Sequence, residues 1–329
     1  MWFEKLTGFC EKSPEQVREN IMVNNGVLTS QVNGTKYTCG LLEIPSLAEL
    51  RNRVQQTEGV SGKISVREIV ADVQQLHTEK ANTGALFQVA SQFNLLEMPS
   101  PGVTPEQGVD SYEYDHTQGP ACAIAAGAGT IYRNYFVEIN GAVGQTAERQ
   151  IDCLADIGAA LRNTDSRLWQ MKNGYALATE AGLLQINKII HSGTEADIDN
   201  LRELLRIGVQ WNTEVTLNHA HHTVAQAYCS ALPVAYSQPT AELWGDFATL
   251  VLEASYEATI CAGILNFITT GNNTIYLTLV GGGVFGNETD WIISAIKRSL
   301  DLYADVDLDV AIVSHGHSKH LIQELTQLY

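Results

Sequence analysis

The sequence predicts an α/β fold in which a mostly parallel sheet is covered by helices on both faces. Apolar runs of strand length alternate along the chain with segments whose apolar residues recur at helical spacing. The run at residues 85–90, Ala-Leu-Phe-Gln-Val-Ala, is almost wholly apolar, as in a parallel strand that is buried on both faces. With 45% hydrophobic residues in a chain of 329, there is enough apolar surface for a large core.

Composition restricts the classes of partner. The chain has 20 Lys and Arg against 37 Asp and Glu, a formal net charge of -17 that repels nucleic acid and anionic membrane surfaces. No run approaches the about 18 consecutive apolar residues of a membrane span, and the start does not have the pattern of a signal peptide. The six cysteines lie far apart. We therefore expect a cytoplasmic protein with free thiols, and neither nucleic acid nor a membrane as partner.

The first 60 residues are predicted to be an extension that packs on a main domain spanning residues 61–329. Ser13 followed by Pro14 predicts a helix through about residue 24, with the serine as cap. The pair Asn33-Gly34 predicts a hairpin within residues 26–42, and residues 47–56 form a further helix. The segment is too poor in apolar residues to form a core of its own.

The main domain is expected to begin with two strands that end in polar residues. The first strand covers residues 64–73 and has Asp72 at its end, and the second covers residues 85–90 and is followed by Gln92 and Asn94. Ligands of open α/β sheets bind beyond the carboxyl ends of the strands. These three polar residues should therefore share one rim of the sheet.

A long loop at residues 98–120 follows, rich in proline, acidic and aromatic residues. Composition alone is consistent with a solvated acidic loop. Loops longer than about 12–15 residues are, however, usually functional or disordered, and the aromatic and proline content argues against disorder. The loop runs through Thr117, Gln118, Gly119 and Pro120 into a helix of small residues at 121–129, whose first amides are free to bind a ligand.

Residues 131–218 are predicted to be a helical insertion. Helices are expected at 146–161, 183–190 and 196–209, with a short strand at 175–179. His219, His221 and His222 invite a zinc interpretation, but no cysteine or carboxylate stands nearby at ligand spacing. Structural histidines and no metal site are therefore expected.

The last third of the chain returns to alternating strands and helices. Strands are expected at 223–234, 275–279 and 310–314, and helices at 244–266, 291–300 and 321–328.

A glycine turn, residues 281–287, joins a strand to a helix. Glycine allows positive φ and close approach of the backbone to a ligand, and the free amides of the next helix favour an anion such as a diphosphate. Gly281, Gly283 and Gly286 also match the dinucleotide fingerprint G-x-G-x-x-G, but a Rossmann fold has this turn after its first strand and little chain remains here. A glycine turn that merely connects two elements is the remaining alternative.

The order of these motifs resembles the macrodomain superfamily, including its poly(ADP-ribose) glycohydrolase-like members. The resemblance covers residues 64–130 and 220–329, and it is carried by Asp72, residues 86–94, residues 119–124 and, most specifically, residues 282–287. It implies a three-layer α/β/α fold with a mostly parallel mixed sheet that binds ADP-ribose without a cofactor. The residues that would contact ADP-ribose are Asp72, Gln92, Asn94, Thr117, Gln118, Gly119, Pro120, Gly281, Gly282, Gly283, Val284, Phe285, Gly286 and Asn287.

The paired-glutamate signature of poly(ADP-ribose) glycohydrolases is absent, and residues 105–119 look more like the acidic, arginine-directed branch. The resemblance thus implies hydrolysis of the N-glycosidic bond between ADP-ribose and an arginine of a modified protein. Carboxylates near the anomeric carbon would stabilise the oxocarbenium-like transition state. Asp110 and Asp115 are the expected catalytic residues, one orienting the guanidinium and the other activating water, with Glu106 as the substitute.

Two other functions remain open on these residues. A binding module would read ADP-ribose without cleaving it, although such a module has no use for clustered acids at the ribose. A hydrolase could instead act on a free ADP-ribose derivative such as ADP-ribose 1''-phosphate, although clustered carboxylates disfavour an anionic substrate.

Overall fold

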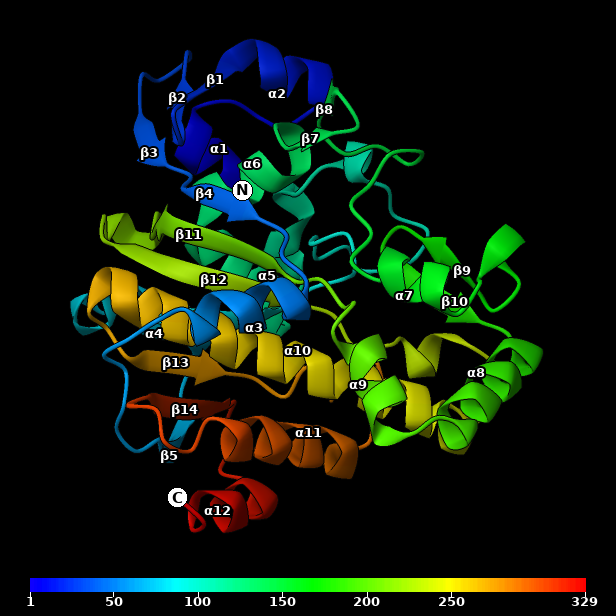
Figure 1. Cartoon of the computed structure of the whole chain (residues 1–329). Coiled ribbons are helices and arrows are strands. Elements are labelled where there is room, and N and C mark those ends of the chain that lie inside the picture. The colour runs from blue at the N-terminus through cyan, green and yellow to red at the C-terminus, as the bar shows by residue number, and fades with distance from the viewer.

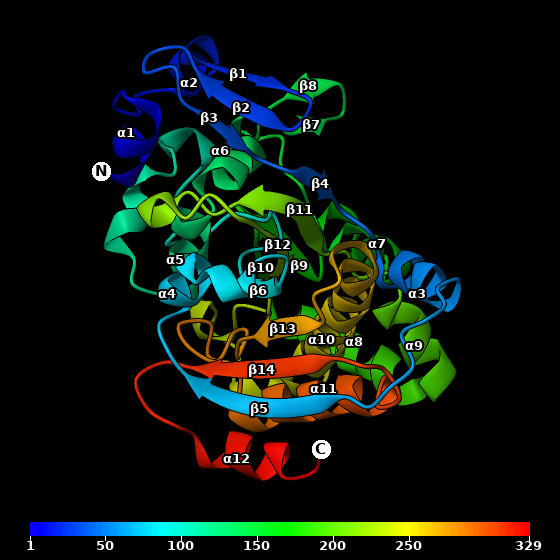
Figure 2. The same ribbon diagram turned by 90° about the vertical axis from the view of Figure 1, so that its left-hand side faces the viewer.

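The computed structural model describes residues 1–329 and shows a mixed α/β fold around one seven-stranded sheet (Figure 1). The strand order is β4-β11-β12-β6-β13-β14-β5, which is visible from top to bottom in Figure 2. Only β11 runs against its two neighbours, so the sheet is mostly parallel, as predicted. The strands are β4 (Leu41–Glu43), β11 (Gly208–Glu214), β12 (Thr223–Cys229), β6 (Leu86–Ala90), β13 (Thr274–Leu277), β14 (Asp309–Ser314) and β5 (Ser65–Val70).

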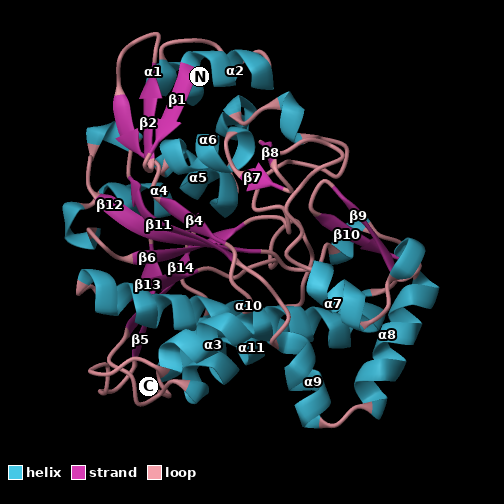
Figure 3. Cartoon of the chain, turned by 45° about the horizontal axis from the view of Figure 1, so that its top comes forward, coloured by secondary structure: helices cyan, strands magenta, loops and turns pink.

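Helices cover both faces of this sheet and give three layers (Figure 3). One layer contains α3 (Leu47–Gln55), α10 (Ala241–Thr270) and α11 (Thr289–Leu302), with α10 packed on β6, β12 and β13. The other layer contains α4 (Val73–Thr78), α5 (Gln118–Ala125) and α6 (Gly127–Tyr135), with α5 on β6 and α6 on β11. The C-terminal helix α12 (His320–Thr326) packs against β5 and α11.

The helix α10 is the central helix of its layer. It ends at Gly271, which takes the left-handed conformation with φ of 75°, a common glycine stop for helices. By length and composition α10 could cross a membrane, but 83% of its most apolar window is buried inside the fold. Its apolar character is therefore explained by packing in the core.

The first 40 residues form α1 (Trp2–Thr7), α2 (Pro14–Asn20) and a small antiparallel sheet of β1 (Ile21–Asn24), β2 (Val27–Ser30) and β3 (Lys36–Thr38). The Ser13 hydroxyl accepts a hydrogen bond from the Gln16 amide, so the predicted cap is present, although the helix ends at Asn20. Apolar side chains of this segment share a second core with residues from 96 to 135.

The predicted helical insertion, residues 131–218, contains helices and the strand expected at 175–179, and also strands that were not predicted. The elements not yet described are β7 (Glu138–Ile139), β8 (Ala142–Val143), α7 (Ala155–Ala160), β9 (Trp169–Lys172), β10 (Tyr175–Ala178), α8 (Glu180–Ser192) and α9 (Glu195–Arg202).

Two predicted helices of this segment differ from the structure. Residues 146–154 are not helical: Gln145 accepts a hydrogen bond from the Ile151 amide and donates to the Asn94 carbonyl, which holds the segment against the loop after β6. The helix expected at 196–209 ends at Arg202, because the chain from Gly208 onward pairs with β4 and β12 as a strand of the central sheet.

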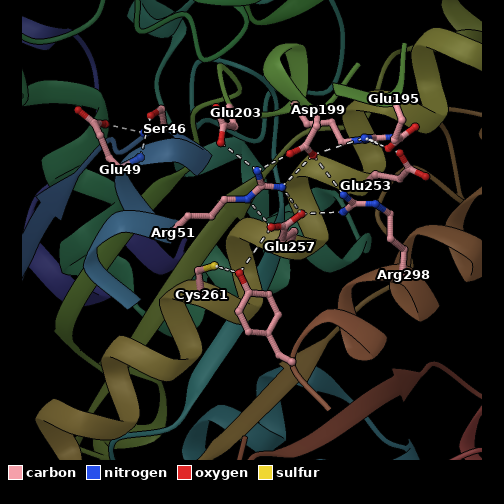
Figure 4. Close-up of polar contacts among 12 residues, drawn as sticks. Ser46, Glu49, Arg51, Glu195, Asp199, Glu203, Glu253, Glu257, Cys261 and Arg298 are labelled. Carbon is pink, nitrogen blue, oxygen red and sulfur yellow. Dashed lines mark hydrogen bonds and ion pairs between the residues drawn. The ribbon is translucent and has the colours of Figure 1, made fainter. Parts of the chain in front are cut away.

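A cluster of ion pairs joins α3, α9, α10 and α11 (Figure 4). The Arg51 guanidinium of α3 lies 2.5 Å from a Glu257 oxygen of α10 and 2.7 Å from an Asp199 oxygen of α9. Arg298 of α11 lies 2.6 Å from the other Glu257 oxygen. Glu257 is 2% exposed, so its charge depends on these two arginines for compensation. The cluster connects the N-terminal extension and the insertion to the core.

Candidate active site

Two adjoining cavities lie where the parallel strands β5, β6, β13 and β14 end. The large cavity, of about 1010 Å³, is lined by Asp72 after β5 and by Gly282 and Gly283 after β13. The small cavity, of about 150 Å³, is lined by Gln92 after β6 and by residues 281 and 283–285. This is the side of an α/β sheet on which ligands bind. The two cavities share Asp115, Thr117, Gln118, Thr278, Leu279 and Gly283.

The glycine turn leaves several backbone amides without a partner. The turn is closed by hydrogen bonds from the Gly286 amide to the Gly283 carbonyl and from the Asn287 amide to the Gly281 carbonyl. The amides of Gly283, Val284 and Phe285 donate to no other group of the protein. An unpaired amide beside a cavity is a donor for an anionic ligand.

Glycine is required at two positions of this turn. Gly281 has φ of 78°, and a Cβ there would lie 2.4 Å from the Ala231 Cβ. Gly286 has φ of 72°, and a Cβ there would lie 2.9 Å from the Ala235 Cβ. Gly286 and the buried Asn287 do not line either cavity, so they shape the turn and are not placed to contact a ligand inside it.

The second loop, at residues 117–120, lies against the same two cavities. Thr117 and Gln118 line both cavities, and Gly119 and Pro120 line the small one. The amides of Gln118 and Gly119 are the first of α5 and have no hydrogen-bond partner in the protein. The Gln118 side chain fixes the loop on β6, because it accepts from the Ala90 amide and donates to the Gln88 carbonyl. The two predicted loops are thus brought together.

Asp72 stands two residues after the end of β5 and caps α4. Its Oδ1 accepts a hydrogen bond of 2.8 Å from the Gln74 amide. Its second oxygen accepts no hydrogen bond in the protein, and the residue is exposed to the large cavity. The side chain is therefore held by the cap while one oxygen stays available.

Gln92 and Asn94 differ in position. Gln92 lines the small cavity and accepts a hydrogen bond from the Met98 amide through its Oε1. Asn94 is fully buried, donates to Gln150 and accepts from the Leu96 amide, and it lines neither cavity. Asn94 therefore shapes the loop after β6, which corrects its placement at the rim.

Of the three predicted catalytic acids, only Asp115 reaches the cavities, and it lines both. Its Oδ1 accepts hydrogen bonds from the amide and the hydroxyl of Thr117, at 2.9 and 2.7 Å. This turn places the carboxylate at the start of the second loop, where the two cavities meet.

Asp110 and Glu106 lie outside both cavities. The Asp110 amide donates to Glu11 of the N-terminal extension, and burial raises the pKa of the Asp110 carboxyl. Glu106 accepts a hydrogen bond from the Ala147 amide. The Asp110 backbone and the Glu106 carboxylate are thus held by neighbouring segments, because the loop folds back onto residues that sequence spacing could not locate. This placement corrects the expectation that they surround the sugar.

The small cavity contains an acid that was not predicted, Glu97. Its side chain is buried, its Oε2 has no hydrogen-bond partner, and it lines the cavity together with Gln92 and Gly119. Burial raises the pKa of the Glu97 carboxyl to about 7, and the Arg133 guanidinium opposes this shift. The signal in the sequence was an acid inside an apolar run, Leu95-Leu96-Glu97-Met98, a few residues after a buried strand.

The N-terminal extension also contributes to the large cavity, through Trp2, Lys5, Leu6 and Tyr37. Lys5 and Lys319 are cations in its wall, in a chain whose net charge is strongly negative. His219 lines the cavity as well, whereas His221 pairs with Glu214 at 2.8 Å. No group of three or more histidine, cysteine or acidic side chains is placed to hold a metal ion.

Neither a protein-family model nor a curated relative matches the chain. Among solved structures, it is similar to poly(ADP-ribose) glycohydrolase from Thermomonospora curvata bound to the inhibitor ADP-HPD, with 11% identity over 96% of this chain and 97% of that one and a TM-score of 0.42. It is also similar to poly(ADP-ribose) glycohydrolase from Deinococcus radiodurans in complex with ADP-ribose, with 12% identity over 87% and 92% and a TM-score of 0.43. Because these values are low, the functional argument rests on the cavities themselves.

Proposed function

We propose that this protein binds ADP-ribose in the two cavities and hydrolyses the N-glycosidic bond that joins it to an arginine side chain of a modified protein. The observation that carries the proposal is that two loops far apart in the sequence, residues 117–120 and 281–285, line one pair of cavities with unpaired amides. Amides in this arrangement suit a diphosphate.

The remaining groups suit the two ends of ADP-ribose. The free oxygen of Asp72 can accept a hydrogen bond from the adenine amino group in the large cavity. The distal ribose would then enter the small cavity beneath the glycine turn, beside Gln92 and Asp115. Lys5 and Lys319 offset part of the repulsion between the acidic chain and a diphosphate.

The chemistry needs negative charge near the anomeric carbon. Breaking the N-glycosidic bond builds oxocarbenium character there, and a carboxylate close to it stabilises the transition state more than the ground state. Asp115 lies where the cavities meet and is our proposed group for activating water. The Asp115 carboxylate, in the wall of both cavities, also favours a cationic arginine acceptor over an anionic one.

A second function, binding of ADP-ribose without cleavage, is favoured by one observation. Both hydrogen bonds of the Asp115 carboxylate go to Thr117, which is also the arrangement expected of an acid that only shapes a loop. A reader module would use the loops and Asp72 and would need no group for activating water.

Two measurements separate these functions. Calorimetric titration with ADP-ribose tests binding, and release of ADP-ribose from a protein modified on arginine tests hydrolysis. For Asp115→Asn, which keeps an acceptor oxygen for Thr117, we expect normal binding and a turnover lowered about 10²- to 10⁴-fold. The matched control is Asp165→Asn, an exposed residue of the insertion. If the wild-type protein binds ADP-ribose but releases none from the substrate, the reader function is favoured. If it does not bind ADP-ribose, both functions are contradicted.

A further inference from the structure

An ionisable side chain, that of Glu97, lies at the edge of the small cavity and was not among the predicted site residues. Glu97 is 2% exposed, and Met98, Tyr175, Tyr236 and Phe285 line the same cavity. A carboxyl group among apolar and aromatic side chains is costly to bury unless it is paired or serves a purpose. The groups around Glu97 therefore show whether its carboxyl is fully paired or is left available to a ligand.

Arg133 pairs with Glu97 only weakly. The Arg133 Nη2 lies 3.5 Å from the Glu97 Oε1, whereas the same guanidinium donates at 3.0 Å to the Leu95 carbonyl and at 3.2 Å to the Thr130 hydroxyl. It also donates to the Tyr228 hydroxyl and lies 3.7 Å over that ring. Most hydrogen bonds that the Arg133 guanidinium donates thus go to neutral acceptors.

One carboxyl oxygen of Glu97 is left without a partner. Its Oε2 is buried and makes no hydrogen bond, whereas the Glu97 amide donates to the Tyr112 hydroxyl at 2.9 Å. A buried oxygen that lacks a partner beside a cavity is a site for a ligand hydrogen bond or for a proton.

We propose that Glu97 is the catalytic general acid of this site, and that its Oε2 carries the proton delivered to the leaving group in the small cavity. This inference rests on the proposed function, because it assigns the second of the two carboxyl groups that glycosidic hydrolysis requires. It differs from the sequence-based expectation, which placed both acids in the loop at residues 106–115.

The proton balance of the step is as follows. The bond from the anomeric carbon to the guanidine nitrogen breaks with its electron pair on nitrogen, which takes the proton of Glu97. Water attacks the anomeric carbon and gives one proton to Asp115. Glu97 then regains a proton from solvent and Asp115 releases one, so the products are ADP-ribose and arginine and no other reactant is consumed.

The ionisation of Glu97 suits this role. Burial raises the pKa of its carboxyl to about 7, so the group can hold a proton near neutral pH and still release it. The titratable groups around it are Arg133 of α6, Tyr112 of the loop that follows Glu97, Cys122 of α5 and Tyr228 of β12. Arg133 favours the charged form and opposes the effect of burial.

The test compares Glu97→Gln with Glu148→Gln, the same change at an exposed residue that lines neither cavity. Two substrates are used: a protein modified with ADP-ribose on arginine, and an ADP-ribosyl nitrophenyl ether whose leaving group departs as an anion. We expect Glu97→Gln to lower kcat about 10²- to 10⁴-fold on the arginine-linked substrate and to leave the ether reaction and ADP-ribose affinity nearly unchanged. Glu148→Gln should match the unmodified protein on both.

The pH profile gives a readout that a purely structural role would not change. For the unmodified protein, kcat on the arginine-linked substrate should fall as pH rises through about 7, and this limb should be absent for the ether. The profile needs no variant, so it tests the proposal even if Glu97→Gln does not fold. Equal losses on both substrates, or a limb present for both, would overturn the role of Glu97. If the wild-type protein neither binds ADP-ribose nor cleaves either substrate, the proposed function itself is rejected.

Discussion

Gly119 lies directly against Glu97, so the second loop covers the edge of the small cavity with almost no space to spare. A Cβ at Gly119 would stand 3.1 Å from the Glu97 Cγ and 1.9 Å from the Ala90 carbonyl oxygen. The absence of a side chain at residue 119 therefore lets the first turn of α5 approach both the end of β6 and the buried carboxyl.

Gly119→Ala should disturb this contact. Because the Ala90 carbonyl belongs to the sheet and cannot move freely, we expect the free energy of unfolding to fall by about 1–3 kcal/mol and ADP-ribose affinity to fall with it. Chemical denaturation and calorimetry measure the two effects. The control is Gly102→Ala, where the nearest atom is 3.6 Å away. Equal stability of the two variants would show that the approach of α5 is looser than the structure indicates.

Gly283→Ala should separate folding from binding. A Cβ at Gly283 meets no atom within 4 Å, so we expect stability to stay unchanged. The added methyl group would occupy the space beside the unpaired amides, and ADP-ribose affinity should fall at least about tenfold. Thermal unfolding and calorimetric titration test this. Unchanged affinity would mean that the diphosphate does not approach the glycine turn.

The fold was predictable where local pattern and packing agree. The strands 85–90 and 275–279 and the helix 47–56 were found because each has the apolar pattern of a buried element. The strand β11 was not predicted, and its first two residues fall in the helix expected at 196–209, since this segment becomes a strand only by pairing with β4 and β12, which are distant in the sequence.

The candidate site was predictable only in its backbone. Two features predict that residues 117–120 and 281–285 are ligand-binding loops. Both segments contain glycine, and both stand directly before a helix. The acids could not be placed in this way. Asp110 and Asp115 stand in one loop, yet the first contacts Glu11 and the second contacts Thr117, so they lie in different places. The sequence marks Glu97 only as an acid inside an apolar run, and its place beside the small cavity depends on how the chain folds.

Substitutions of Asp72 should distinguish its cap from its ligand role. Asparagine also caps helices, so Asp72→Asn should leave stability unchanged, whereas Asp72→Ala should cost about 1 kcal/mol. Both should weaken ADP-ribose binding, by about 10- to 100-fold, through loss of a hydrogen bond to a charged oxygen. Denaturation and calorimetry check each change. Full affinity in Asp72→Asn would exclude the carboxylate as a contact for adenine.

The ion-pair cluster around Glu257 should matter for stability and not for binding. Glu257→Gln leaves Arg51 and Arg298 without their buried counter-charge, and we expect a loss of about 3 kcal/mol. None of these residues lines either cavity, so ADP-ribose affinity should persist. Glu15→Gln, which removes an exposed ion pair with Arg18, should cost much less than Glu257→Gln. Similar losses in both variants would show that the cluster is unimportant.

Stability should depend on pH through Glu97. Its pKa is about 7 in the folded protein against an ordinary value of 4.5, so between these values the unfolded chain releases a proton that the folded protein keeps. The stabilising contribution is complete below pH 4.5 and falls by roughly 3 kcal/mol as pH rises to 7. His77 acts in the opposite direction, because burial lowers its pKa from 6.5 to about 4.

The Glu97→Gln variant isolates this contribution. The difference in free energy of unfolding between the unmodified protein and the variant should decrease from pH 4.5 to 7, since both retain His77. Denaturation at several pH values measures it. A difference that stays constant over this range would show that the carboxyl of Glu97 titrates at its ordinary value.

Two loops that are distant in the sequence should form one binding site for a diphosphate, and a crystal structure of the protein with ADP-ribose would show whether they do. We expect the diphosphate within hydrogen-bond distance of amides from both residues 118–119 and residues 283–285, with the distal ribose in the small cavity. A structure with ADP-ribose bound elsewhere, or touching only one of the two loops, would contradict it.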